Sequence, residues 1–300
     1  MPRAEINGVE IEFAASGDPA APAFLLFMGA GEQLVLWPRA LVDELTAAGF
    51  RVIRFDYRDA GLSTKFDEAG PVDLVRLIGD LQSGQEVTVP YQLTDMGRDA
   101  IGILDSLGIE KAHVAGLSLG GMVAQTVALS HPERVLSLTS IASTTGDRRL
   151  PPPNPGVVMQ MYSLPPGAGE DAWIDARVQA MTAMQGSKYR ASTAEIRAAA
   201  EISVRRSVAP AGVTRHVAAS IVAPPRGETL KQFRRPVLVI HGTDDAVMPS
   251  VCGEYTAACA PDSTYVPVEG MGHGFSESLM AVWSEQMIAL ARRAAVQSPG

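Results

Sequence analysis

The sequence predicts an α/β fold in which helices cover both faces of a mostly parallel sheet. Two observations carry this prediction. Short apolar strands alternate with helical stretches through the first half of the chain, which is the pattern of strand–helix–strand units. The alternation stops between about residues 143 and 231 and then resumes toward the C-terminus. The chain is therefore expected to consist of one core and one helical insertion.

The core elements follow from local signals taken in chain order. Asn7-Gly8 stands between two short runs of alternating apolar residues, which is a strong hairpin signal. The expected strands cover residues 4–6, 9–13, 24–27, 51–55, 111–115, 135–141, 236–240 and 263–268. The expected core helices cover residues 38–48, 94–107, 121–129 and 277–294. The stretch from Phe66 to Tyr91, rich in Gly, Pro and acidic residues, is expected to form a loop.

The insertion has clear sequence boundaries. A proline run, Pro151–Pro155, forms a stiff entry, and Pro224-Pro225 marks the exit. No buried strand is expected between them, and helical stretches are expected at residues 171–184, 192–208 and 212–221. We therefore assign residues 1–143 and 227–300 to the core and residues 144–226 to a helical lid.

Composition and charge exclude several classes of partner. The 300 residues are 46% hydrophobic and 19% charged, which is sufficient for a sizeable core. The net charge is −8 without a Lys/Arg cluster, so neither nucleic acid nor an anionic membrane surface is an expected partner. No segment has the length of a membrane span or the apolar core of a secretory signal. A cytoplasmic protein is expected, and a homodimer is compatible with the sequence.

The two cysteines support the same location. Cys252 and Cys259 lie on one expected helix, where their spacing separates them by roughly 10 Å, too far for a disulfide. Two free thiols suit a reducing compartment.

Gly116-Leu117-Ser118-Leu119-Gly120 forms a G-x-S-x-G motif between an apolar strand and an apolar helix. A strand, a sharp turn and a helix are the setting of a nucleophile elbow. The glycines are expected to allow the tight turn and to leave room for substrate above the serine. The helix N-terminus directs N–H groups and partial positive charge toward an oxyanion formed there. The motif therefore predicts that Ser118 is a nucleophile.

A serine nucleophile needs a base, and the base needs an acid that orients it. Because parallel strands end at a common edge, the partners are expected in the loops after the last two strands. His273, between two glycines, is the predicted base. Asp245 or its neighbour Asp244, in the segment His241–Pro249, is the predicted acid.

The chain resembles the α/β-hydrolase superfamily over nearly its whole length. The resemblance rests on the elbow, the Ser…Asp…His order, the H-G-x-x-D-x-x-x-P segment at His241–Pro249, the G-x-G-H around His273, and the segment Asp56–Ser63. It implies the α/β-hydrolase fold with an eight-stranded, mostly parallel sheet and an inserted lid, and it assigns the acid to Asp245. Within the superfamily, Met28–Gly31 and the overall layout look most like the aclacinomycin (anthracycline) methylesterases. The serine-dependent macrolide esterases are a second analogy.

The resemblance also implies an oxyanion hole built from two backbone N–H groups. One belongs to Leu119, directly after the nucleophile, and the other to Ala30, in the loop after the third strand. The family usually has His-Gly where this chain has Met28-Gly29. Because the donor is a backbone N–H, the change at position 28 is expected to cost little.

Substrate contacts are expected from methionine and tryptophan side chains, since methionine adapts to irregular apolar shapes. The candidates are Met28 near the oxyanion loop and Met181, Met184 and Trp173 in the lid. The same helical spacing describes ordinary core residues, and this alternative stays open. Met159, Met161 and Tyr162 belong to the same group of lid residues.

The remaining polar residues predict no metal or cofactor. No histidine or cysteine pair has metal-ligand spacing, and no phosphate-binding glycine motif occurs. His113 is interpreted as a packed core residue, His131 as lying near a helix C-terminus, and His241 as bracing the acid loop. His216 is expected in the lid, facing either solvent or substrate.

The sequence thus predicts a carboxylesterase-type serine hydrolase that works through an acyl-enzyme. The expected substrate is a medium-to-large amphiphilic ester or lactone, of the polyketide methyl ester or macrolide type. A C–C bond hydrolase, a hydroxynitrile lyase or a perhydrolase on the same scaffold stays open. Ser118 disfavours the epoxide hydrolases and haloalkane dehalogenases, which have Asp at the elbow. A non-catalytic small-molecule receptor is the alternative from another class.

Overall fold

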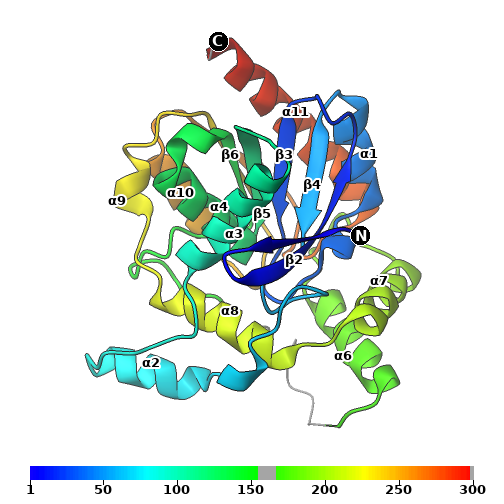
Figure 1. The fold of residues 1–300 in the computed structure, drawn as a ribbon, viewed down its shortest axis with the longest axis vertical. Coiled ribbons are helices and arrows are strands. Elements are labelled where there is room, and N and C mark those ends of the chain that lie inside the picture. The colour runs from blue at the N-terminus through cyan, green and yellow to red at the C-terminus, as the bar shows by residue number, and fades with distance from the viewer. Residues whose placement is uncertain (155–166, 298–300) are drawn as a thin grey trace.

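The computed structural model describes residues 1–154 and 167–297, in which eight strands form one sheet flanked by helices (Figure 1). The strand order is β1-β2-β4-β3-β5-β6-β7-β8. β2 pairs antiparallel with β1 and with β4, and every other neighbouring pair is parallel. This arrangement confirms the predicted mostly parallel, eight-stranded sheet.

Each predicted strand is present, with ends shifted by no more than three residues. The strands are β1 (Arg3–Ile6), β2 (Val9–Ser16), β3 (Ala23–Phe27), β4 (Arg51–Phe55), β5 (Ala112–Leu117), β6 (Val135–Ile141), β7 (Val237–Gly242) and β8 (Ser263–Val268). The principal helices of the core are α1 (Arg39–Ala47), α2 (Leu74–Gln82), α3 (Leu93–Ser106), α4 (Leu119–Ser130), α10 (Val251–Cys259) and α11 (Glu277–Gln297). Short 3-10 turns cover Leu34–Leu36 (η1), Asp67–Ala69 (η2) and Pro132–Arg134 (η3).

The opening hairpin has the turn that its sequence predicts. Asn7 and Gly8 both have positive φ, 50° and 75°, as a two-residue turn between right-twisted strands requires. Ile6 faces Val9 across the turn.

The core lies on both faces of the sheet. Along β3, Leu25 packs in one large apolar cluster with residues of α3 and α4. The next residue, Leu26, packs in a second cluster with residues of α1 and α11. Because successive side chains of a strand point to opposite faces, a strand buried on both sides reads as a continuous apolar run.

The expected loop between Phe66 and Tyr91 contains a helix, α2, so that expectation is wrong in part. Asp73 caps its N-terminus by accepting a hydrogen bond from the Arg76 N–H at 3.0 Å. Apolar residues recur along it at helical spacing, a signal that the composition of the surrounding segment obscured.

The helices α6 (Glu170–Ala183), α7 (Thr193–Arg206) and α8 (Pro210–Val222), with the short α9 (Gly227–Leu230), lie between β6 and β7 in the chain. The helices predicted for this region are therefore present, and the part of it that the structure describes contains no strand. α2, α6, α7 and α8 gather at one end of the sheet, below the strands in Figure 1. Within the described ranges, no helix combines the length and the apolarity needed to cross a membrane.

Candidate active site

Ser118 lies in a strained turn between β5 and α4. Its φ and ψ are 55° and −120°, a region that non-glycine residues rarely occupy. Two hydrogen bonds to the end of β6 and the loop after it help to hold it there. Its N–H donates to the Ile141 carbonyl at 2.9 Å, and its carbonyl accepts from Ser143 Oγ at 2.7 Å. This is the geometry of a nucleophile elbow.

The glycines of the motif permit close backbone packing around the serine. A Cβ on Gly116 would lie 2.1 Å from the Gly120 carbonyl oxygen, and a Cβ on Gly120 would lie 2.0 Å from that of Phe27 in β3. Gly116 and Gly120 are therefore needed because the elbow packs on itself and on β3, which corrects the expectation that they leave room for substrate. Gly29 borders the serine instead, since its Cβ would lie 3.8 Å from that of Ser118.

Asp245 and His273 are in direct contact. His273 Nδ1 lies 2.8 Å from Asp245 Oδ2. The second carboxylate oxygen, Oδ1, accepts from the N–H groups of Val247 and Met248 at 2.9 and 2.7 Å. Burial alone would raise the pKa of Asp245, but the adjacent His273 and the backbone donor at Met248 hold that pKa below its usual value.

Asp244, the other candidate acid, has different partners. Its Oδ2 accepts from the Ser187 N–H at 3.0 Å, and its Oδ1 accepts from Thr243 Oγ1 at 3.0 Å. The Asp244 side chain is thus occupied at the surface, and of the two neighbours Asp245 is the one beside His273.

One large cavity brings the predicted catalytic residues together. Ser118 and His273 line it, and so do Gly29, Ala30 and Leu119. Its volume is about 1310 Å³, above the range of roughly 300–1,000 Å³ common for small-molecule pockets. The nucleophile candidate, the base candidate and both predicted oxyanion donors therefore share one space.

The predicted substrate contacts divide into two pairs. Met181 and Met184 line the cavity. Met28 is fully buried in the α1–α11 core cluster, and Trp173 packs against the small cluster of Ile174, Ala200 and Val204. The side chains of Met28 and Trp173 are not part of the cavity wall, which corrects the expectation for both. Met159, Met161 and Tyr162 lie outside the described residues.

Sequence reasoning missed most of the apolar wall. The wall includes residues of α2, α7 and α8, namely Leu74, Val75, Ile78, Ile202, Val217 and Ile221. Val75 is 77% exposed even though it lines the cavity. The helical spacing of residues 74–82 could have revealed α2, but no local pattern shows that its apolar side borders this cavity.

Three other histidines are buried and bond to neighbouring backbone or side-chain groups. His113 is buried with its Nδ1 2.8 Å from Ser137 Oγ, and burial lowers its pKa to about 4. His241 lies with Nε2 2.9 Å from the Met248 carbonyl, so it supports the loop of Asp245 as predicted. His216, expected to face solvent or substrate, faces neither. Its side chain is fully buried where α8 packs against the core loops that contain Gly31 and Arg58.

Metal-ligating side chains do not cluster in the part of the chain that the structure describes. Among those residues, no group of three or more His, Cys, Asp or Glu is placed to hold a metal ion. Cys252 and Cys259 are both buried free thiols.

The chain belongs to the α/β-hydrolase family. A family model described as alpha/beta hydrolase fold matches residues 22–278. Rhodomycin D methylesterase DauP of Streptomyces sp. (strain C5) is 30% identical over 285 residues, covering 86% of each chain. Rhodomycin D methylesterase DnrP of Streptomyces peucetius is 29% identical over 303 residues, covering 91% of this chain and 92% of its own.

Solved structures agree on the fold. The enol-lactonase from Burkholderia xenovorans LB400 superposes with a TM-score of 0.70 at 21% identity, covering 97% of this chain and all of its own. These comparisons confirm the α/β-hydrolase fold and the resemblance to the anthracycline methylesterase branch. The chain is thus an enzyme of the carboxylesterase type, and its reaction class is ester hydrolysis.

Proposed function

We propose that Ser118, His273 and Asp245 form the catalytic triad of this esterase. One observation carries the proposal: a serine in the strained elbow geometry shares a cavity with a histidine that a buried aspartate orients at 2.8 Å. A serine hydroxyl becomes a useful nucleophile when such a histidine can take its proton.

The proposed reaction has two half-reactions with one tetrahedral species in each. His273 takes the Ser118 proton as Oγ attacks the ester carbonyl, and then protonates the departing alcohol as the carbon–oxygen bond breaks. Water attacks the acyl-enzyme with the same base, and the acid leaves as Ser118 recovers its proton. Asp245 stabilises the His273 imidazolium in both steps.

The proposed oxyanion donors are the N–H groups of Leu119 and Ala30. Leu119 is the first residue of α4, where helix geometry directs N–H groups and partial positive charge outward. Ala30 follows Gly29, whose backbone borders Ser118. Met28 is not expected to weaken this site, because its side chain is buried in the core.

The proposed substrate is a medium-to-large amphiphilic ester or lactone, with a polyketide methyl ester favoured. The cavity volume of about 1310 Å³ and the methionines Met181 and Met184 in its wall support this class. The two relatives named as rhodomycin D methylesterases support the methyl ester. We also propose that residues 144–226 act as a lid on a core of residues 1–143 and 227–300, in a cytoplasmic enzyme.

The test is the Ser118→Ala variant, assayed beside the wild type on p-nitrophenyl esters from acetate to octanoate and on a polycyclic methyl ester. Removal of a nucleophilic serine should lower kcat by at least about 10³-fold. Ser106→Ala, an exposed serine at the end of α3, is the matched control and should keep full activity.

The outcomes separate the alternatives. Ser118-dependent release of acid and alcohol supports the triad, and the chain-length profile sizes the acyl pocket. Turnover that persists in Ser118→Ala would overturn the assignment. A wild type that binds the ester without turnover would indicate a receptor, and cleavage of a carbon–carbon bond would indicate different chemistry on the same scaffold.

A further inference from the structure

The loop after β3 is held by all three long helices of the insertion. Gly31 bonds to α8, Glu32 pairs with α6, and Gln33 bonds to α7. Three successive residues thus have partners between 145 and 185 positions away in the chain. The same loop carries Ala30, the proposed second oxyanion donor, so its position depends on the insertion.

His216 on α8 makes the most specific of these contacts. Its Nε2 lies 2.7 Å from the Arg58 carbonyl oxygen, which can only accept, so Nε2 carries the proton. Nδ1 is therefore the acceptor for the Gly31 N–H at 3.0 Å. Burial lowers the pKa of His216 to about 4, and the neutral ring that both bonds require is the form present near pH 7.

Two glycines let α8 approach the core loops this closely. Gly31 has a φ of +69°, and a Cβ on it would lie 2.3 Å from Val213 Cγ2 of α8. A Cβ on Gly212 of α8 would lie 2.4 Å from the Asp59 carbonyl oxygen. The Gly31 peptide is consequently held by close packing against α8 as well as by its hydrogen bond to His216.

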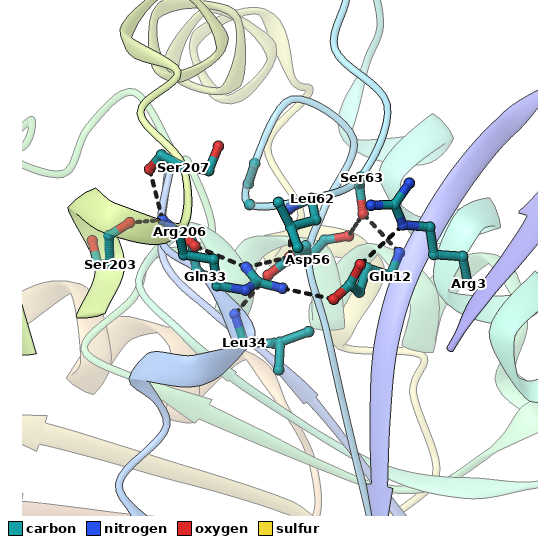
Figure 2. A network of polar contacts seen from close by, with 12 residues as sticks. Arg3, Glu12, Gln33, Leu34, Asp56, Leu62, Ser63, Ser203, Arg206 and Ser207 are labelled. Atoms are coloured by element: carbon teal, nitrogen blue, oxygen red, sulfur yellow. Dashed lines mark hydrogen bonds and ion pairs between the residues drawn. The ribbon is translucent and has the colours of Figure 1, made fainter. Parts of the chain in front are cut away.

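Gln33 joins the same loop to the end of α7, as Figure 2 shows. Its Nε2 donates to the carbonyls of Ser203 and Ser207 at 2.8 and 2.9 Å. These carbonyls lie in the last turn of α7 and just beyond it, and the Ser203 carbonyl also accepts from the Ser207 N–H at 3.0 Å. Its Oε1 accepts from Arg206 Nη1 at 2.8 Å.

Asp56 links the residue after this loop to Arg206 of α7. Its Oδ1 accepts from the Leu34 N–H at 2.8 Å, and its Oδ2 pairs with Arg206 Nη1 at 2.7 Å and accepts from the Leu62 N–H at 2.9 Å. Arg206 also reaches Glu12 in β2 at 3.2 Å (Figure 2). A buried network with this many partners has little freedom to rearrange.

We propose that the inserted helices position the oxyanion loop, and that His216 is the positioning residue that fixes the Gly31 peptide and, through it, the Ala30 N–H. This inference rests on the proposed function. An oxyanion donor acts mainly in the transition state, so a displaced donor lowers kcat more than it raises KM. The insertion therefore has a catalytic effect in addition to forming the wall of the cavity.

Two substitutions of His216 each remove one of its two hydrogen bonds and keep the other. In His216→Asn the amide oxygen replaces Nδ1, so the acceptor for Gly31 stays while the donor to Arg58 is lost. In His216→Gln the amide reaches the position of Nε2, so the donor to Arg58 stays while the acceptor for Gly31 is lost. We expect His216→Gln to lower kcat on the order of 10–100-fold with KM nearly unchanged, because a shift of about 1 Å in a catalytic group costs that much. His216→Asn should keep most of kcat.

His113→Asn is the matched control, because His113 is also buried and neutral but bonds to Ser137, away from the loop. It should lower stability and leave kcat unchanged. Equal kcat losses in the Asn and Gln variants of His216, or losses that follow stability alone as in the control, would overturn the proposal. Should neither His216 variant fold, Gln33→Met removes the bonds to α7, and an unchanged kcat there would overturn it.

Hydrogen exchange of the segment spanning residues 28–36 separates this inference from the proposed function. If the wild type shows no Ser118-dependent turnover, the proposed function fails and the catalytic part of this inference fails with it. Faster exchange in His216→Gln than in His216→Asn would still support positioning of the loop by His216. Equal exchange in the two variants would overturn that as well.

Discussion

α8 and the α6–α7 pair (Glu170–Arg206) belong to one insertion but are attached to the molecule differently. α8 is held by Arg215, whose side chain is fully buried and bonds through two nitrogens to the equally buried Asp59 at 2.7 Å each. The α6–α7 pair has its own core of only three buried residues, Ile174, Ala200 and Val204. The ion pair between its two helices, Arg205 with Glu170, is more than half exposed, and its buried ion pair to the core, Arg206 with Asp56, lies at the end of α7.

Position in the sequence therefore does not decide which structural unit a helix joins. Asp59 also accepts from Tyr91 Oη at 2.6 Å and from the Phe66 N–H at 2.8 Å. Burial alone would raise the pKa of Asp59, but Arg215 and these donors lower it. By its contacts α8 belongs with the core, whereas α6–α7 reaches the core through Arg177 of α6 and the end of α7.

The largest expected effect follows from Arg215→Met, which removes the charge and nearly keeps the volume. Asp59 would then be a buried carboxylate without its cation, and breaking such a pair typically costs about 3–5 kcal/mol. We expect the free energy of unfolding to fall by that amount in chemical denaturation. The double variant Asp59→Asn/Arg215→Met should recover part of the loss, because no uncompensated charge remains. A single variant as stable as the wild type would contradict the distinction between α8 and α6–α7.

The next effect is a dependence of stability on pH to which α8 contributes and α6–α7 does not. The folded pKa of His216, about 4, lies below the ordinary histidine value of about 6.5. As pH falls from about 6.5 to 4, the unfolded chain takes up a proton that the folded chain does not, so stability is lost. At about 1.4 kcal/mol for each pKa unit, the loss is about 3 kcal/mol.

Residues 170–206 contain no histidine, so this titration acts on α8 and not within α6–α7. His113, with its pKa also lowered to about 4, contributes in the same direction. Denaturation at pH 7 and at pH 4.5 should therefore show a smaller difference in His216→Asn than in the wild type. An identical difference in both proteins would show that His216 does not titrate as a buried neutral group.

The features that the sequence predicted are those with local signals. Apolar runs mark the strands, and Ser118, Asp245 and His273 each follow one of them, which predicts all three at one edge of the sheet. Each strand and the motif that follows it lie within a short stretch of chain. The structure brings the corresponding loops together at one cavity because parallel strands end at a common edge.

The features that the sequence missed depend on distant partners. Met28 and Met181 are both methionines near expected site segments, yet one is in the core and the other lines the cavity. His216 bonds to Gly31 across 185 positions of chain, and nothing around either residue indicates the other. Apolarity predicts that a side chain is buried, but it does not predict which side chains border an opening.

The smallest expected effect tests the other half of the comparison. Arg205→Gln removes the ion pairs to Glu170 on α6 and to Glu201 one turn earlier on α7, at 3.0 and 3.2 Å. Exposed pairs are screened by water and salt and contribute little to stability. We expect a denaturation midpoint within error of the wild type in high salt and a barely lower one in low salt. A loss as large as that of Arg215→Met would mean that the exposed pairs within α6–α7 matter as much to stability as the buried pair that holds α8.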